Sequence, residues 1–174
     1  MKWSAVLTAA VAGLAFVAPA MAGPATATAN TTIAIVSPAT LISTRDLDFG
    51  TIAKPTAGTT TVTLASAATA TATPSVSGGN GFIPTAGLAR AATFHLIGSN
   101  GQTYSITANT LSITGAAGNL ASIGSEAPVA ASGTLNTLPA SGTDDLYVGG
   151  HFDISSTTAV QTYNGVLSLT VNFN

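Results

Sequence analysis

The chain has 174 residues and a formal net charge of −2, and only 6% of its residues are charged, whereas an ordinary soluble domain has about a quarter. No basic cluster is present to neutralise phosphates, which argues against nucleic acid as a partner. Cysteine is absent, so no disulfide contributes to the fold.

The first 22 residues have the order of a cleavable secretory signal peptide. Lys2 and the terminal amine form a short positive region, and an apolar run over residues 5–18 follows it. Pro19 ends the run, and Ala20-Met21-Ala22 places small residues at the −3 and −1 positions of a cleavage site. Because the run is too short to cross a bilayer of ~30 Å as a helix, we expect cleavage after Ala22 and export through the inner membrane.

Removing the first 22 of the 174 residues leaves 152, which suits one domain with a sizeable core. Without Lys2 the chain has three basic and six acidic residues, a net charge of −3. Small and polar residues fill the surface instead of charges. Because few charges repel a neighbouring molecule, such a chain tolerates close packing against copies of itself.

An alternating segment opens the mature chain. Small or apolar residues stand at every second position, at Ala25, Ala27, Ala29, Thr31, Ile33 and Ile35. This period of two predicts an extended strand, and Pro38 ends it because proline cannot donate to a sheet ladder. We therefore divide the chain into a signal peptide (1–22), an N-terminal extension that is a candidate donor strand (23–37) and a β-sandwich domain (38–174).

The next motif is Asp48-Phe49-Gly50, whose sequence is the same as that of the metal-binding motif of protein kinases. No glycine-rich loop or strand lysine precedes it here, so the match does not indicate a kinase. We expect Leu47 and Phe49 in the core, Asp46 and Asp48 on the solvent face, and Gly50 at a bulge or turn. A calcium site at Asp46 and Asp48 stays open, since Ca²⁺ takes oxygen ligands, although the D-x-D-x-D-G pattern is absent.

The rest of the domain is predicted to be all-β, because helix-forming residues are scarce and glycine and threonine recur every few residues. The predicted strands are 59–65, 69–76, 91–97, 103–108, 111–113, 133–138, 146–154 and 166–173. Asn100-Gly101 predicts a hairpin between two of them, because both turn residues need positive φ. Residues 115–132 predict a loop with at most one strand. This spacing of strands and turns is typical of a sandwich or barrel.

Few residues in the sequence are suited to catalysis or metal binding. His95 lies between Phe94 and Leu96 and should face away from them as a half-exposed strand residue. His151 and Asp153 share a strand face, but no third histidine or cysteine is available to complete a metal site. No G-x-S-x-G motif is present, and no histidine stands near a nucleophile motif. We therefore expect no enzyme, no cofactor and no bound metal.

The C-terminal segment alternates up to the last residue. Leu167, Leu169, Val171 and Phe173 share one face, and Ser168, Thr170, Asn172 and Asn174 share the other. We expect a final strand whose apolar face packs on the core.

Together, these two ends resemble subunits of chaperone–usher fimbriae. The closest resemblance is to an uncharacterised family of small, Thr/Ala-rich bacterial β-sandwich proteins linked to fimbrial chaperones. Segments similar to 47–52, 146–150 and 163–173 of this chain recur in that family. The cysteine pair of many such pilins is absent here.

The resemblance implies an immunoglobulin-like or pilin-like β-sandwich that lacks one strand and assembles by donor-strand exchange. A periplasmic chaperone would pair beside residues 167–173 and bind the carboxylate of Asn174, and the 25–35 segment of the next subunit would later replace it. The implied partners are copies of itself or related subunits, the chaperone and an outer-membrane usher, and the implied location is the periplasm and then the cell surface. The residues leave one alternative open, a standalone adhesin or binding module whose loops, such as 115–132, contact a ligand.

Overall fold

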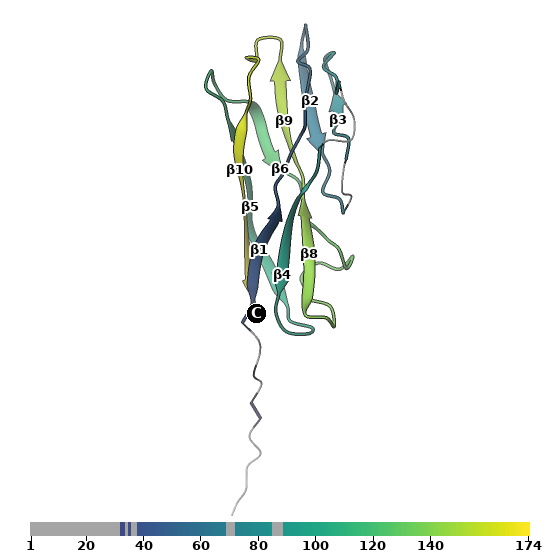
Figure 1. The fold of residues 1–174 in the computed structure, drawn as a ribbon, viewed down its shortest axis with the longest axis vertical. Helices are drawn as coiled ribbons and strands as arrows, with labels where there is room; N and C mark the ends of the chain where they lie inside the picture. The colour runs from purple at the N-terminus through teal and green to yellow at the C-terminus, as the bar shows by residue number, and fades with distance from the viewer. Residues whose placement is uncertain (1–31, 34, 36–37, 69–71, 85–88) are drawn as a thin grey trace, which may run out of the picture. The chain divides into compact units, whose positions relative to one another are not determined.

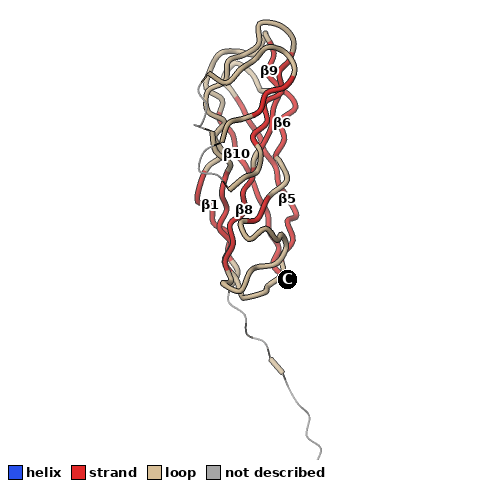
Figure 2. Tube along the Cα trace, turned by 90° about the vertical axis from the view of Figure 1, so that its right-hand side faces the viewer, coloured by secondary structure: helices blue, strands red, loops and turns tan. Residues whose placement is uncertain are grey.

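The structure is a computed structural model that describes residues 32, 33, 35, 38–68, 72–84 and 89–174. The predicted signal peptide and the candidate donor positions Ala25, Ala27, Ala29 and Thr31 lie outside the described residues. Ile35–Asn174 belong to one compact unit, and Met1–Ala34 are grouped separately. Within the described residues every regular element is a β-strand (Figure 1, Figure 2). In the same residues no helix is long and apolar enough to cross a membrane.

The ten strands pair only with antiparallel neighbours. In chain order they are β1 (Thr40–Arg45), β2 (Thr59–Leu64), β3 (Ser75–Ser77), β4 (Ala92–Ile97), β5 (Tyr104–Thr114), β6 (Ala121–Ser125), β7 (Val129–Ala130), β8 (Thr143–Val148), β9 (Gly150–Ser155) and β10 (Asn164–Phe173). They form a first sheet of order β1-β4-β8-β7, a second sheet of order β3-β2-β9-β6, and a two-stranded ribbon of β10 and β5.

Two hydrophobic clusters form the core. The first consists of Ala92, Phe94, Leu96, Tyr104, Ala130, Leu138, Leu146 and Val148, and the second of Val62, Ile113, Leu120, Phe152 and Ile154. The long β10–β5 ribbon supplies residues to both clusters, with Leu169 against the first and Leu111 against the second. It therefore packs over the first sheet and then over the second (Figure 1), and the expected all-β sandwich is confirmed.

Most of the predicted strands are confirmed, in part with different ends. β2, β4 and β10 cover the predicted runs 59–65, 91–97 and 166–173, and the runs 103–108 and 111–113 form the single strand β5. The predicted strand 69–76 is shorter in the described part of the chain, where β3 begins only at Ser75 and Ala72 makes an isolated bridge to Ala89.

The predicted strand 146–154 is wrong as one strand, because the chain leaves the first sheet and enters the second within it. β8 ends at Val148 and pairs with β4, whereas β9 begins at Gly150 and pairs with β2. The backbone at Gly149 passes so close to Leu64 that a Cβ atom there would overlap the Leu64 carbonyl oxygen. The alternation of apolar residues continues across this crossing, which is why the sequence resembles one strand.

The predicted hairpin at Asn100-Gly101 is also wrong. A turn is present, in which Gln102 N donates to Ser99 O at 3.0 Å, but only Gly101 has positive φ, at 67°, as in a type II turn. The strands on either side do not pair, because both edges of β4 are occupied by β1 and β8. The turn instead transfers the chain from the first sheet to the ribbon.

Two further assignments in the second half are corrected. Residues 133–138 form turns rather than a strand, because Gly133 and Asn136 have φ values of 77° and 70°, which interrupt the extended backbone. Residues 115–132, predicted as a loop with at most one strand, contain both β6 and β7. The apolar signal at Leu138 reflects burial, since its exposure is 1%, and not strand structure.

Candidate functional site: an open groove beside β10

The last strand, β10, has the predicted facing. Leu167, Leu169, Val171 and Phe173 are half-buried and pack against the first cluster. β10 pairs along its whole length with β5, from Asn164 opposite Thr114 to Phe173 opposite Tyr104. Asn174 N continues the pairing by donating to Thr103 O at 2.9 Å. The other edge of β10 pairs with no described strand, so its backbone donors and acceptors are open to an added strand.

A second unpaired edge belongs to β1, which pairs only with β4 among the described strands. The β1–β4 register shifts between Ser43 and Arg45. Thr44 Oγ1 donates to Thr93 O at 3.2 Å, and Arg45 Nε donates to Ala91 O at 3.0 Å. These bonds fix the end of β1 on β4 and leave the opposite edge of β1 free.

An open groove of about 880 Å³ separates residues 43–54 from residues 158–167. Its floor is mainly apolar and comes from both clusters, with Ala92, Phe94, Leu111, Ile113, Leu120, Phe152 and Ile154. Phe49 packs edge-on against Phe152, with ring centroids 4.8 Å apart and an interplanar angle of 76°. Along the side where β1 and β10 do not meet, the groove therefore reaches down to apolar residues of both clusters, most of which are at most 9% exposed.

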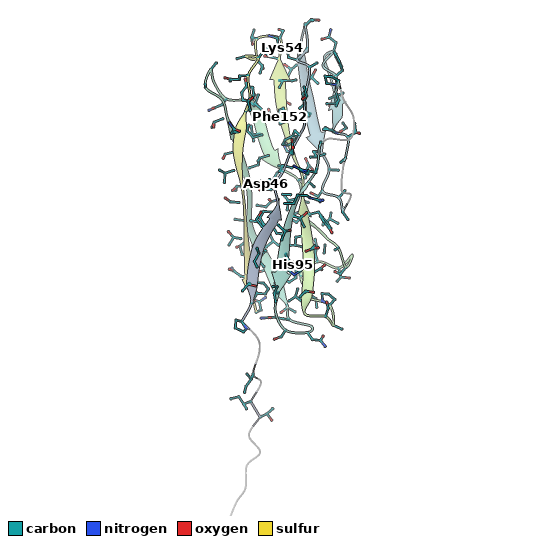
Figure 3. The ribbon with its side chains drawn as sticks, in the orientation of Figure 1. Asp46, Lys54, His95 and Phe152 are labelled. Atoms are coloured by element: carbon teal, nitrogen blue, oxygen red, sulfur yellow. The ribbon has the colours of Figure 1, made fainter. Side chains whose placement is uncertain are left out.

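The two ends of the groove differ. At one end Lys54 Nζ donates to Ser156 O at 3.0 Å and to Thr158 O at 3.2 Å, so it links the two walls. Figure 3 shows Lys54 near this end of the domain, Phe152 next and Asp46 in the middle. Toward the other end the groove lining stops at Leu167, because beyond it the β10 side chains and Leu41 cover the first cluster.

The Asp48-Phe49-Gly50 motif forms one wall of the groove. Leu47 contacts the first cluster and Phe49 the second, as predicted, and Gly50 adopts φ 70° in a turn where its N–H donates to Asp48 Oδ1 at 2.8 Å. Asp48 Oδ2 lies 3.8 Å from Arg90 Nη2. In the described part of the chain no group of three or more His, Cys, Asp or Glu side chains is placed to hold a metal ion. The hypothetical calcium site at Asp46 and Asp48 therefore has no third ligand of these types among those residues.

The histidines have separate carboxylate partners. His95 Nδ1 lies 2.6 Å from Asp145 Oδ1 across β4 and β8, and His95 is half-exposed on the face opposite Phe94 and Leu96, as predicted. His151 Nδ1 lies 2.7 Å from Glu126 Oε1. The Thr61 hydroxyl donates to the Asp153 carboxylate at 2.6 Å and lowers its pKa, with a further hydrogen bond from Ser122.

Of the predicted donor residues, only Ile33 and Ile35 are described, and they are 81% and 90% exposed. Of the predicted interface residues of β10, only Leu167 lines the groove, whereas Leu169, Val171 and Phe173 pack against the first cluster. Sequence reasoning did not identify the opposite wall, 43–54, or the floor at Phe152 and Ile154. The available signal was the spacing of the apolar residues Leu47, Phe49 and Ile52. It indicates that these side chains are buried, but not which residues they pack against.

Comparison with curated proteins found no match for the chain, and comparison with solved structures found none either. One family model matches residues 39–173, which are nearly the whole of the described sandwich, and its description is a domain of unknown function, DUF4402. The chain therefore belongs to the DUF4402 family.

Proposed function

We propose that this chain is a secreted structural subunit of a surface fimbria that assembles by donor-strand exchange. The supporting observation is the groove, which lies between two unpaired strand edges and has apolar residues of both clusters at its base. An added strand would bury that apolar surface, and its backbone would satisfy the free donors and acceptors of the edges. An isolated subunit with this groove uncovered is a hazard for aggregation.

A strand in the groove would lie between β1 and β10. Figure 1 shows that β1 begins, and β10 ends, at the same end of the domain, so these two strands run in opposite directions. The added strand would be antiparallel to one of them and parallel to the other. By pairing with both edges it would join the first sheet to the β10–β5 ribbon.

The proposal includes the partners that such assembly requires. A periplasmic chaperone would cover the groove beside β10 and bind the carboxylate of Asn174, whose backbone N–H is held by Thr103 at the end of the ribbon. An outer-membrane usher would then exchange the chaperone for the N-terminal extension of another copy or of a related subunit. The subunit would pass through the periplasm to the cell surface.

Deletion of residues 23–36 tests the proposal. We expect the truncated chain, made together with its chaperone, to remain a folded complex by gel filtration and circular dichroism, and to form no fibres by electron microscopy. The matched control is Thr26→Ala with Thr28→Ala, which alters the outward face of the extension and should leave fibres intact. Fibres from the truncated chain would refute the proposal, and a mature chain that is a stable monomer without a chaperone would favour the standalone adhesin.

A further inference from the structure

We infer that Asn164, the first residue of β10, is a site of spontaneous deamidation, and that the reaction occurs in chains whose free β10 edge is uncovered. The reaction needs no enzyme and no co-reactant other than water. The choice of site follows from the fold alone, and only the protection of assembled subunits rests on the proposed function.

The chemistry belongs to asparagine residues that are followed by glycine, because glycine has no Cβ to shield its nitrogen. That nitrogen loses its proton and attacks the asparagine Cγ, so an N–Cγ bond forms while the Cγ–Nδ2 bond breaks and ammonia leaves. Water then opens the succinimide ring at either carbonyl and gives aspartate or isoaspartate. The chain has three such pairs, which begin at Asn80, Asn100 and Asn164.

At Asn80 both reacting groups are held. Asn80 Oδ1 accepts a hydrogen bond from Thr56 N at 2.8 Å, and Asn80 Nδ2 donates to Thr56 Oγ1 at 2.7 Å. The attacking nitrogen, Gly81 N, donates to Thr60 Oγ1 at 3.1 Å. Because ring closure must break these bonds, we expect Asn80 to react slowly.

At Asn100 only the attacking nitrogen is held. Gly101 N donates to Leu138 O at 3.2 Å. The Asn100 side chain makes no hydrogen bond to another described residue. We therefore expect Asn100 to react at an intermediate rate.

At Asn164 the attacking nitrogen faces the free edge of β10. Hydroxyl groups of β5 donate to the carbonyl oxygens of Asn164, Val166 and Thr170, each at 3.5 Å, so these carbonyls point toward β5. In a strand the N–H and C=O of one residue point to the same side, and successive residues alternate. Gly165 N therefore points to the opposite edge, which pairs with no described strand.

The Asn164 side chain is free as well. It makes no hydrogen bond to another described residue, and Asn164, Gly165 and Val166 are all exposed. Ring closure requires rotation of the backbone at Asn164, which is the first residue of β10, and the ends of elements open at little cost. A Cβ atom at position 165 would overlap Ser112 O, so packing requires the glycine that makes this pair reactive.

The reaction changes the edge on which it occurs. Asn164 and Gly165 line the groove, and both products add a negative charge there. Isoaspartate also inserts a methylene group into the backbone, which displaces the donors and acceptors at the start of β10. A strand paired with this edge would accept the Gly165 N–H and hold the backbone extended, so it would protect Asn164.

Peptide mapping by mass spectrometry tests the choice of site in the folded mature chain, incubated at mildly alkaline pH. We expect Asn164 to react at least about tenfold faster than Asn80, a factor that corresponds to about 1.4 kcal/mol and lies within the net strength of two hydrogen bonds. In urea all three sites should react at similar rates, because each precedes glycine. Folded rates at Asn164 no higher than at Asn80 would overturn the inference.

A pair of variants tests whether hydrogen bonds set this order. Thr56→Ala removes the oxygen that accepts from Asn80 Nδ2, so it should speed the reaction at Asn80 about fivefold and leave Asn164 unchanged. Thr56→Ser keeps a hydroxyl group and is the matched control, in which Asn80 should stay slow. An unchanged Asn80 rate in Thr56→Ala would overturn the structural basis of the ranking.

Preformed fibres, separated from monomers before the incubation, test the protection of assembled subunits. We expect Asn164 to react at least about tenfold more slowly in fibres than in monomers, whereas Asn100 should react alike in both. Equal Asn164 rates would overturn the protection and leave the proposed function standing. Failure of the chain to form fibres under any assembly condition would refute the proposed function, and the rates at Asn164 and Asn80 in the monomer would still decide the site.

Discussion

At the scale of single residues, Gly149 shows how close approach of two backbones decides where the chain changes sheets. A Cβ atom there would overlap Leu64 O. The backbone cannot easily shift away, because Gly149 N donates a hydrogen bond to Ser66 Oγ at 2.8 Å. We expect Gly149→Ala to lower the free energy of unfolding by about 2 kcal/mol, the typical cost of overpacking. Gly133→Ala is the control, because a Cβ there meets no atom within 4 Å and only its φ of 77° is unfavourable, at a cost of about 1 kcal/mol. Urea denaturation of both variants measures the difference, and equal losses would contradict the steric explanation.

The hydrogen bond from Thr61 to Asp153 predicts a pH dependence of stability. Because the folded pKa of Asp153 is lowered from its usual 3.8, this group stabilises the fold above that value and loses its contribution as the pH falls through the lowered pKa. Thr61→Val should reduce the free energy of unfolding by about 1 kcal/mol at pH 7, a value already discounted for solvent exposure. The difference from the natural chain should shrink as the pH falls below 3.8 and the Asp153 carboxylate becomes protonated.

Urea denaturation of Thr61→Val at pH 7 and at a series of pH values that falls below 3.8 is the measurement for this bond. Thr63→Val is a suitable control, since Thr63 lies on the same strand opposite His151 and its hydroxyl makes no hydrogen bond to another described residue. A loss that is the same at every pH value of the series would show that the Asp153 charge is not involved.

At the scale of elements, the turn at Asn100-Gly101 gives a direct test of the corrected topology. Only Gly101 has positive φ, so Gly101→Ala should cost about 1 kcal/mol and Asn100→Ala should cost little. In the hairpin turn that the sequence suggested, both positions would need positive φ and both substitutions would be costly. Thermal denaturation of the two variants distinguishes these cases.

Alternation predicted which segments are strands and which faces are buried, because both depend on neighbouring residues in the sequence. It did not predict partners, since pairing depends on residues far apart. β4 was expected to pair with the next strand but already has β1 and β8 on its two edges. The candidate site shows the same limit. The β10 wall follows from alternation alone, whereas the opposite wall approaches it through Lys54 and Ser156, which are 102 residues apart.

At the scale of the whole molecule, the direction of a strand donated into the groove determines how subunits stack in the proposed assembly. β1 begins at the end of the domain where the C-terminus lies, and Lys54 lies near the other end (Figure 1, Figure 3). A strand antiparallel to β10 leaves the groove at the Lys54 end, so the domain that donates it must sit on that end. This head-to-tail contact is heterologous and does not close on itself, which is the symmetry of a filament.

A single chain that completes its own groove tests this geometry. A copy of residues 23–37 is joined after Asn174 through a linker of four residues, and the natural extension is removed. Because the linker is short, the added segment reaches the groove only by forming an antiparallel hairpin with β10. We expect a monomer that no longer polymerises, and whose stability rises by about 2.7 kcal/mol if the effective concentration of the segment is a hundred times its dissociation constant. For a domain of this size the midpoint of thermal unfolding should rise by roughly 5–10 °C.

The matched control for this chain carries serine in place of both isoleucines in the added segment, at the positions of Ile33 and Ile35. It has the same length and linker, so it differs only in the two large apolar side chains of the segment. We expect it to unfold at the temperature of the chain without the added segment, because polar side chains gain little by entering an apolar groove. If the control were as stable as the isoleucine version, backbone pairing alone would account for the stabilisation, and the apolar lining of the groove would have no role in selecting the strand.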